Sequence, residues 1–263
     1  MDPSTSSGGG NLGSRFEELF EFSLALDAPS VEMVYRIRHD VYCRELGWEP
    51  VRPDGLEMDE YDPHSVHCLL RKRGSGDPVG CSRLVLARPG DPSFPLPFEQ
   101  SCRDAIHRDQ FDPALLPRSD VGEVSRLAVM SDFRQRQGES NKPIAVGEQD
   151  FESRGGQPRF PFIPMSLYLG AAAAARRLDV ENVFVLTEPR LANHFVRLGF
   201  DIHPIGDEIE HRGIRVPSVL SSSKVVGNLR PLIQPLYAVI ERLVNRSFEL
   251  HPEALERLRP SQH

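Results

Sequence analysis

The alternation of apolar and polar positions predicts the first half of the chain as strand, helix and hairpin. From Phe20 to Leu26, apolar residues alternate with polar or small ones, which is typical of a half-buried strand. A helix should follow with Ser30 as its N-cap, and Gly47 should end it in the C′ position. Two more alternating runs, 66–71 and 79–87, are separated by a Gly/Ser/Asp turn and should form an antiparallel hairpin.

In the second half of the chain, the same pattern predicts strands that alternate with helices. A loop with a short helical segment near 102–107 should lead into a central strand over 123–130. The remaining predicted elements are a helix over 164–177, a buried strand over 183–186, a helix over 189–198, one or two strands within 202–219 and an apolar-striped helix over 232–244. Early hairpins followed by a strand–helix–strand end predict an α/β (α+β) fold, a mixed, mostly antiparallel sheet flanked by helices.

Length and composition predict one domain with extensions. The chain has 263 residues, of which 39% are hydrophobic, enough for one large core. The Ser/Gly-rich segment 1–14 is expected to be a disordered tail, 15–225 the main domain and 226–263 a helical extension. We find no run of about eighteen apolar residues and no secretory signal, so we expect a cytoplasmic protein without a transmembrane segment. The C-terminal helix should pack onto the domain, with contact to a membrane surface as the alternative.

The charge and the cysteines exclude some classes of function. A net charge of −7 argues against a nucleic-acid partner held by bulk charge. The four cysteines, at positions 43, 68, 81 and 102, show no C-x-x-C pairing, so we expect structural thiols. The histidines offer no metal spacing either, and we expect no metal. The long polar segment 132–161 predicts a functional or mobile loop.

Two charges interrupt the central strand, in Gly122-Glu123-Val124-Ser125-Arg126-Leu127-Ala128-Val129. Glu123 and Arg126 are three residues apart, so on a regular strand they point to opposite faces. Either they serve separate networks or a β-bulge turns one toward the other, which would also free backbone N–H groups to stabilise an oxyanion. A purely structural ion pair is the alternative. Ser125 lacks the G-x-S-x-G context of a serine hydrolase.

A third charge on an apolar face is Arg83, whose neighbours on the same face are Cys81 and Val85. A buried guanidinium needs a carboxylate, and Asp59 and Asp62 of the acidic loop are the best candidates. The acidic run could instead be a solvated turn.

The helix before this loop carries Arg38 and Tyr42 on one stripe, followed by Trp48, the only tryptophan. Trp48 is either a packing anchor or a substrate contact. After the central strand, Arg134 and Arg136 lie in a short basic loop of the kind that can hold a pyrophosphate before a helix N-terminus.

Taken in order, these residues resemble the residue set of the autoinducer synthases, which make acyl-homoserine lactones, and of the N-acyl amino acid synthases. The set comprises Arg38, Tyr42, Trp48, Asp59, Asp62, Arg83, Glu123 and Arg126. Acyltransferases associated with PEP-CTERM/exosortase gene systems are similar in four motifs, namely Tyr42-Cys43-Arg44-Glu45, Pro53-Asp54-Gly55-Leu56-Glu57, Glu123 to Val129 and Glu188-Pro189-Arg190-Leu191. The resemblance extends over roughly 20–217.

This resemblance implies a GNAT-like fold and transfer of a long-chain acyl group to the amine of a small acceptor. The donor would be an acyl carrier protein or coenzyme A thioester, with no further cofactor. Glu123 would be the base, with Arg126 beside it as the second catalytic residue. The acceptor site would comprise Arg38, Tyr42, Trp48, Asp59, Asp62, Arg83 and Ser125, with Arg38 holding an acceptor carboxylate by a bidentate contact. Arg134 and Arg136 would contact the donor.

Two departures from the autoinducer synthases favour an amino acid as acceptor over S-adenosylmethionine. Tyr42 stands where those enzymes typically have Phe, and the segment 134–161 is longer than in their smallest members. An acyl-homoserine-lactone synthase and a non-catalytic sensor of acyl lipids are the alternatives. The helix 164–175 would wall an acyl tunnel or simply be core. An acidic carrier protein would dock on basic residues, for which Arg71 to Arg73, Arg134, Arg136, Arg176 and Arg177 are candidates.

Overall fold

A single mixed sheet organises the molecule, as the sequence predicts. The computed structural model describes residues 10–88, 90–134 and 161–259. The sheet order is β1-β2-β3-β4-β5-β8-β6, with β7 paired to β8, and the β4–β5 pair is parallel while the other pairs are antiparallel. The strands are β1 Phe20–Ala25, β2 Ser65–Lys72, β3 Pro78–Leu86, β4 Val121–Val129, β5 Asn182–Thr187, β6 Ile202–Pro204, β7 Ile209–Glu210 and β8 Ile214–Ser221.

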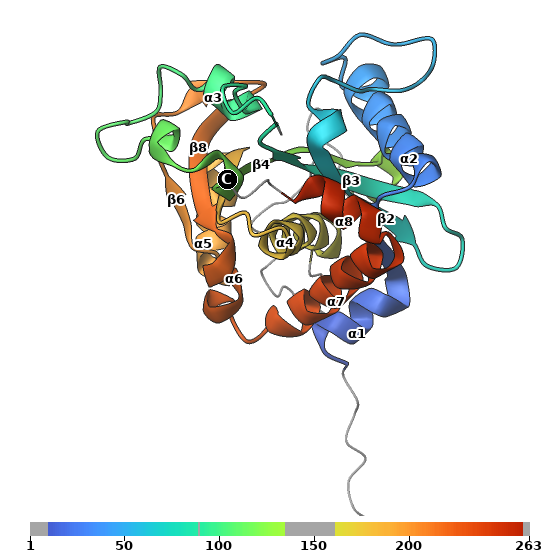
Figure 1. Cartoon of the computed structure of the whole chain (residues 1–263). Helices are drawn as coiled ribbons and strands as arrows, with labels where there is room; N and C mark the ends of the chain where they lie inside the picture. The colour runs from blue at the N-terminus through green and yellow to red at the C-terminus, as the bar shows by residue number, and fades with distance from the viewer. Residues whose placement is uncertain (1–9, 89, 135–160, 260–263) are drawn as a thin grey trace, which may run out of the picture.

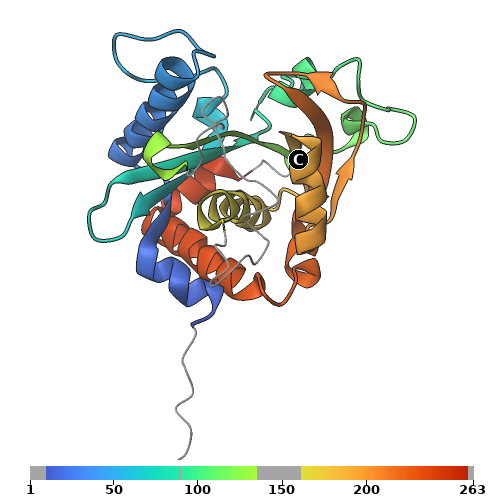
Figure 2. The same ribbon diagram turned by 180° about the vertical axis from the view of Figure 1, so that it is seen from behind.

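Helices cover both faces of this sheet (Figure 1). They are α1 Leu12–Leu19, α2 Ala28–Arg38, α3 Pro97–Ser101, α4 Phe162–Arg177, α5 Pro189–Leu198, α6 Ser222–Asn228, α7 Gln234–Leu250 and α8 Pro252–Leu258. Short 3-10 turns occur at Asp62–His64, Pro113–Leu115, Arg118–Asp120 and Ser131–Phe133. Figures 1 and 2 show α2 on one face of the sheet and α4 on the other, with α7 and α1 beyond α4.

The main core lies between α4 and the sheet. The run Ala171 to Ala175 is buried, and Gly170 faces the ring of Phe22 so closely that a Cβ there would lie 2.2 Å from it. These small side chains bring the helix close to β2 and β3 without leaving a void. The predicted alanine-rich helix is therefore confirmed, two residues longer at its start than expected.

Several boundaries differ from the sequence expectations. Asp27, not Ser30, caps α2, because its Oδ1 accepts the Ser30 backbone N–H over 2.9 Å. After Arg38 the helix continues as a π-helix, His39–Glu45, and Gly47 follows in the left-handed conformation with φ 63°. α1 begins at Leu12, inside the segment expected to be a tail, and the short helix α3 precedes the expected 102–107. The segment 202–219 contains β6, β7 and most of β8 rather than one or two strands. Helix α6 was not anticipated, and α8 lies within the expected helical extension 226–263.

The two halves of the sheet separate from each other between β4 and β5. β5 pairs with β4 only from Val121 to Val124, although β4 runs on beside β3 to Val129. Figure 1 shows β8 and β6 running across the direction of β2 and β3. The second half of β4 therefore forms one side of an opening in the sheet.

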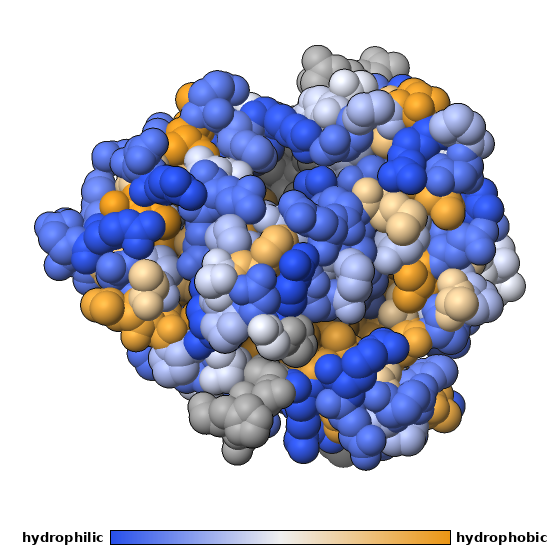
Figure 3. Space-filling view, turned by 45° about the horizontal axis from the view of Figure 1, so that its top comes forward, coloured by the Kyte–Doolittle hydropathy of each residue, from blue (hydrophilic) through white to orange (hydrophobic). Residues whose placement is uncertain are grey.

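The described helices include none that is long and apolar enough to cross a membrane. The face shown in Figure 3 is mostly hydrophilic, with hydrophobic residues in small separate groups. Helix α7, the apolar-striped helix expected near the C-terminus, packs against α4 and β1, and its buried residues Ile240 and Val244 belong to the main core.

Candidate active site

Three arginines and three carboxylates alternate around a closed ring of ion pairs on the α2 face of the sheet. In order around the ring they are Arg38, Glu57, Arg126, Asp59, Arg83 and Asp62. The charges of the six groups cancel, so each buried guanidinium has an anionic neighbour on either side. The ring joins the end of α2, the acidic loop, β3 and β4.

Asp62 is the most heavily bonded member of the ring. Arg38 donates to it from Nη1 over 2.6 Å and from Nη2 over 3.1 Å, and Arg83 Nη1 donates over 2.8 Å. The Asp59 backbone N–H adds a further hydrogen bond over 2.7 Å. Burial opposes ionisation of Asp62, but the two guanidinium groups outweigh it and hold its pKa well below the ordinary value. Asp62 is therefore a fixed anion at neutral pH.

The prediction that Arg83 pairs with Asp59 and Asp62 is confirmed. Arg83 Nη1 lies 2.6 Å from Asp59 Oδ1, and its Nε donates to Ser125 Oγ over 3.2 Å. Burial raises the pKa of Asp59, while Arg83 and Arg126 lower it to a value below the ordinary one. The acidic run is thus a loop held against the sheet rather than a solvated turn.

The expected contact between Arg38 and an acceptor carboxylate is wrong for this structure. Arg38 is fully buried, and its Nε, Nη1 and Nη2 each donate to Glu57 or Asp62. These carboxylates hold the pKa of Arg38 above its usual value despite burial. Arg38 therefore holds the acidic loop in position. Glu57 was missed as a site residue, although the unmet need of a buried Arg38 for a carboxylate was a signal for it.

A β-bulge is present at Arg126, as one of the two sequence alternatives required. The β3–β4 register shifts between the Cys81–Ala128 and Arg83–Ser125 pairs, and Arg126 has φ 51°. The bulge does not bring Arg126 into an ion pair with Glu123. Arg126 turns instead to the ring, with Nε 3.3 Å from Glu57 and Nη2 3.2 Å from Asp59. The alternative of two separate networks is therefore confirmed, whereas the alternative of a bulge that turns Arg126 toward Glu123, and with it a structural Glu123–Arg126 ion pair, is wrong.

Glu123 is a buried acid without an arginine partner at ion-pair distance among the described residues. It is 4% exposed, and its Oε2 accepts the Phe98 backbone N–H over 2.7 Å. The Phe98 ring is itself fixed by stacking on Phe184 of β5, with centroids 4.1 Å apart. Burial raises the pKa of Glu123 to about 8, although the Phe98 hydrogen bond and the charges of Arg83 and Arg126 work against the shift. Sequence alone gave no signal for the Phe98 donor, which is a backbone group.

Tyr42 and Trp48 stack beside the bulge. Their ring centroids lie 6.0 Å apart at 23°, and the Arg126 guanidinium lies 5.7 Å from the Tyr42 ring. The Tyr42 hydroxyl donates to the Leu127 carbonyl over 2.9 Å. Tyr42 lies on the π-helix, a distortion that is frequent at functional sites. Both rings thus line the approach to the second half of β4.

Of the two expected donor contacts, only Arg134 lies within the described residues. It forms an ion pair with Glu45, and burial lowers its pKa. Arg136 and most of the insertion after it lie outside that part of the chain.

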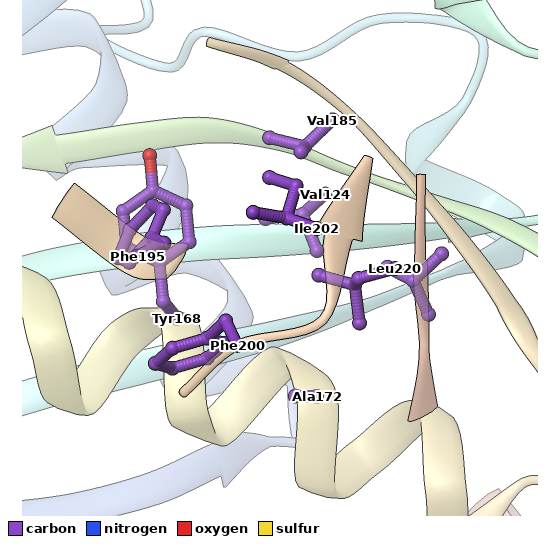
Figure 4. A pocket seen from close by; sticks show the side chains of 9 residues that line it. Val124, Tyr168, Ala172, Val185, Phe195, Phe200, Ile202 and Leu220 are labelled. Atoms are coloured by element: carbon purple, nitrogen blue, oxygen red, sulfur yellow. The ribbon is translucent and has the colours of Figure 1, made fainter. Parts of the chain in front are cut away.

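An apolar pocket lies on the opposite face of the sheet from the ion-pair ring. Its nine lining residues come from α4, β4, β5, α5, β6, β8 and the turn before β6, and are Val124, Tyr168, Ala172, Val183, Val185, Phe195, Phe200, Ile202 and Leu220. Figure 4 shows Tyr168 and Phe195 at one end and Leu220 at the other. The free space is only about 10 Å³, room for one water molecule, so a longer chain must displace side chains.

Glu123 and this pocket lie on opposite faces of β4. Val124 lines the pocket, and its neighbours Glu123 and Ser125 point to the other face. Both lie where β5 parts from β4. In the described part of the chain, three or more His, Cys, Asp or Glu side chains nowhere gather as metal ligands would.

Comparison with known proteins gives a family match and several relatives. Residues 37–141 match the acetyltransferase (GNAT) domain. The isovaleryl-homoserine lactone synthase of Bradyrhizobium diazoefficiens is 37% identical over 101 residues, 32% of this chain and 45% of that protein. The acyl-homoserine-lactone synthase of Aeromonas salmonicida is 32% identical over 111 residues, 40% of this chain and 46% of that protein. The chain thus spans less than half the length of these curated relatives.

Solved structures show the same fold. A CoA-dependent acyl-homoserine lactone synthase, BjaI, with SAM and isopentyl-CoA, superposes with a TM-score of 0.51 at 20% identity, covering 86% of this chain and 89% of that one. For the AHL synthase LasI the TM-score is 0.53 at 16% identity, covering 80% and 95%. The predicted GNAT-like fold is confirmed. Residues 37–141 thus match an acetyltransferase (GNAT) domain, and the described chain has the fold of the acyl-homoserine lactone synthases.

Proposed function

We propose that this chain is an N-acyltransferase that moves an acyl group from a thioester to the amine of a small acceptor. One observation carries the proposal. Glu123 is a buried carboxyl whose pKa is raised to about 8, on the strand where the sheet opens. A general base works best when its pKa lies near the working pH, and deprotonating an ammonium group requires such a base.

We assign the acceptor amine to the Glu123 side of β4 and the acyl chain to the pocket on its other face. Glu123 takes a proton from the acceptor ammonium, and the free amine attacks the thioester carbon. The C–S bond breaks, the thiolate leaves and takes up a proton, and the new amide nitrogen loses its second proton to solvent. Backbone N–H groups at the Arg126 bulge stabilise the oxyanion, and the acyl chain occupies the pocket beside Val124.

The ion-pair ring supports the acceptor side of this site. Asp59 and Arg126 are each about a quarter exposed, whereas Arg38, Arg83 and Asp62 are buried. We assign direct acceptor contact to the exposed members, together with Trp48 and Ser125, whereas Tyr42 is buried and supports the Trp48 ring by stacking on it. The buried members position them.

We propose an acyl carrier protein or coenzyme A thioester as the donor, entering near Arg134, and no further cofactor. The cytoplasm, where both thioesters are made, is the proposed location, with peripheral membrane contact as an option for long-chain products. On the resemblance of Glu188-Pro189-Arg190-Leu191, we also propose a place among the PEP-CTERM/exosortase-associated acyltransferases, which the genomic neighbourhood of the gene tests.

Two acceptors are supported by different observations. The matching relatives are named as homoserine lactone synthases, which favours S-adenosylmethionine. The hydroxyl of Tyr42, which binds the Leu127 carbonyl at the edge of the site, departs from the autoinducer synthase pattern and favours a different amine, an amino acid.

Incubation of the full chain with acyl carrier protein and coenzyme A thioesters decides between them. Each donor is paired with S-adenosylmethionine or with a set of amino acids, and products are identified by mass spectrometry while thiol release is followed. An acyl-homoserine lactone or an acyl amino acid identifies the acceptor. Absence of any acylated amine with every donor contradicts the proposed function.

The variant Glu123→Gln separates an enzyme from a sensor. We expect thiol release to fall by about 100-fold or more, since one general base contributes that much, with acyl-donor binding retained. Glu60→Gln is the matched control, an exposed carboxylate of the acidic loop that should keep full turnover. A sensor binds the acyl ligand but releases no thiol even in the wild type.

A further inference from the structure

The hairpin of β7 and β8 ends in a tight turn with Arg212 at its tip. Ile209 pairs with Arg215 and Glu210 with Ile214, and the Gly213 backbone N–H donates to Glu210 Oε1 over 2.8 Å. Arg212 has φ 56°, a left-handed conformation that costs a residue with a side chain about 1 kcal/mol or more.

Arg212 makes three contacts with the segment that follows the π-helix. Its Nη2 lies 2.7 Å from Glu49 Oε1 and donates to the Trp48 carbonyl over 3.3 Å. Its guanidinium also lies 5.3 Å from the centroid of the Trp48 ring. An isolated surface ion pair contributes little, but a guanidinium that bonds a carboxylate and a carbonyl and also covers an aromatic ring is held in one place.

These contacts lead directly into the candidate site. Arg126 Nη2 lies 3.4 Å from the same oxygen, Glu49 Oε1. Trp48 stacks on Tyr42, and Arg126 lies against the Tyr42 ring. Arg126, Tyr42, Trp48 and Arg212 therefore form a continuous series of contacts, with one carboxylate bonded to the arginines at both ends.

The series crosses the opening in the sheet. Arg212 belongs to the hairpin that extends β8, on the β5 side, whereas Trp48 and Glu49 follow α2 on the other side. Between them β4 and β5 are paired only up to Val124 and Val185. The contacts of Arg212 are thus a tie between the two halves of the sheet, next to the bulge.

We propose that Arg212 is a positioning residue that closes the acceptor side of the site by holding Trp48 and Glu49 against Tyr42 and Arg126. The role of this contact in acceptor binding rests on the proposed function. Without Arg212, Glu49 loses its shorter ion pair and Trp48 loses the cation over its ring, so the acceptor site loosens while the acyl pocket on the other face is unaffected.

Trp48 is the only tryptophan and reports on this contact without any assay of activity. We expect Arg212→Ala to raise the acrylamide quenching constant of its fluorescence about twofold, with Arg212→Lys between Ala and wild type, because lysine keeps the charge but not the planar fork. The control is Arg242→Ala, which removes an exposed 2.6 Å ion pair with Glu17 at α7 and α1 and should leave quenching unchanged. Equal quenching in Arg212→Ala and wild type overturns the proposal.

Kinetics test the positioning role itself. Arg212→Ala should raise the acceptor KM about tenfold, the effect of losing one charged hydrogen bond, with the donor KM unchanged. In the double variant Arg212→Ala/Glu49→Gln the acceptor KM should rise no further than in whichever single variant has the higher acceptor KM. An unchanged acceptor KM overturns the role even if quenching changes. A wild type that transfers no acyl group contradicts the proposed function instead, and the quenching comparison still decides whether Arg212 holds Trp48.

Discussion

Arg38 and Asp62 form a buried bidentate ion pair, with Nη1–Oδ1 at 2.6 Å and Nη2–Oδ2 at 3.1 Å. The pair connects the end of α2 to the acidic loop, and Arg83 extends it to β3 through the same Oδ1. Because Arg38, Arg83 and Asp62 are buried, each depends on its neighbours more strongly than a surface charge would. The ring is therefore a unit in which loss of one member leaves others uncompensated.

Asp62→Asn should lower the free energy of unfolding by about 3–5 kcal/mol, because it leaves Arg38 and Arg83 buried with one anion fewer. Urea denaturation of the variant and the wild type measures the difference. Asp54→Asn, the same change at an exposed position of the same loop, should stay within about 0.5 kcal/mol. If the two variants are equally stable, the ring does not support the fold.

Burial of Glu123 should make the protein less stable as the pH rises. A carboxyl whose pKa is raised from 4.5 to about 8 binds more protons in the folded than in the unfolded state between these values. Its contribution is therefore full below about pH 4.5 and is lost as the pH rises toward 8, by up to about 4 kcal/mol. Glu123→Gln should remove this slope, so the stability difference between variant and wild type grows from pH 5 to pH 8. A difference that is constant with pH would show that Glu123 is not buried as a neutral acid.

The same group predicts the pH dependence of catalysis. If Glu123 is the base, only its ionised form is active, and kcat should rise with pH to a plateau with a midpoint near 8. The residual rate of Glu123→Gln should lack this inflection, while Glu60→Gln should retain it. Because kcat is measured with acceptor bound, titration of the free amine does not enter. A midpoint that persists in Glu123→Gln assigns the titration to another group.

Arg126 combines a charge with a strained backbone, and two substitutions separate them. Both Arg126→Ala and Arg126→Gly remove the contacts with Glu57 and Asp59, but only glycine adopts φ 51° without a steric penalty. We expect Arg126→Gly to be more stable than Arg126→Ala by about 1 kcal/mol, with activity lost in both. At Glu21, on strand β1, which pairs with β2 in continuous register, the order should reverse, because glycine is the poorer strand residue. If the alanine variant is more stable than the glycine variant at both positions, the strained bulge at Arg126 is contradicted.

The sequence predicted the parts of the site that depend on the strand pattern. Arg83 had to find a carboxylate because its neighbours on the strand are apolar, and the spacing of Glu123 and Arg126 required either a bulge or two networks. Glu49 and Arg212 were beyond such reasoning. Each lies in a connecting segment without periodicity, and they meet only because the two halves of the sheet face each other across the opening.

Some predicted ends of helices were wrong for a related reason. Ser30 and Asp27 are both good N-caps by type, and only the geometry of the chain decides that Asp27 accepts the Ser30 N–H. Similarly, the spacing of Arg38 and Tyr42 fits a regular helix, but the π-helix after Arg38 follows from the tertiary contacts of this segment, such as the Tyr42 hydroxyl on Leu127. Local pattern determines which segments are helical, and packing determines how they end.

The apolar pocket should set the length of the acyl chain. Ala172→Val adds two methyl groups where only about 10 Å³ is free, so long-chain donors should lose about tenfold in kcat/KM relative to short ones. Leu220→Ala, at the end of the pocket away from Tyr168 and Phe195, should shift the preference toward longer chains. Ala173→Val is the matched control, since Ala173 is as buried as Ala172 on the same helix but does not line the pocket, so it should alter stability without altering the preference. A series of donors of increasing chain length, assayed in competition, gives the ratios. Were Ala172→Val and Ala173→Val to show the same chain-length profile, the acyl group would have to lie elsewhere.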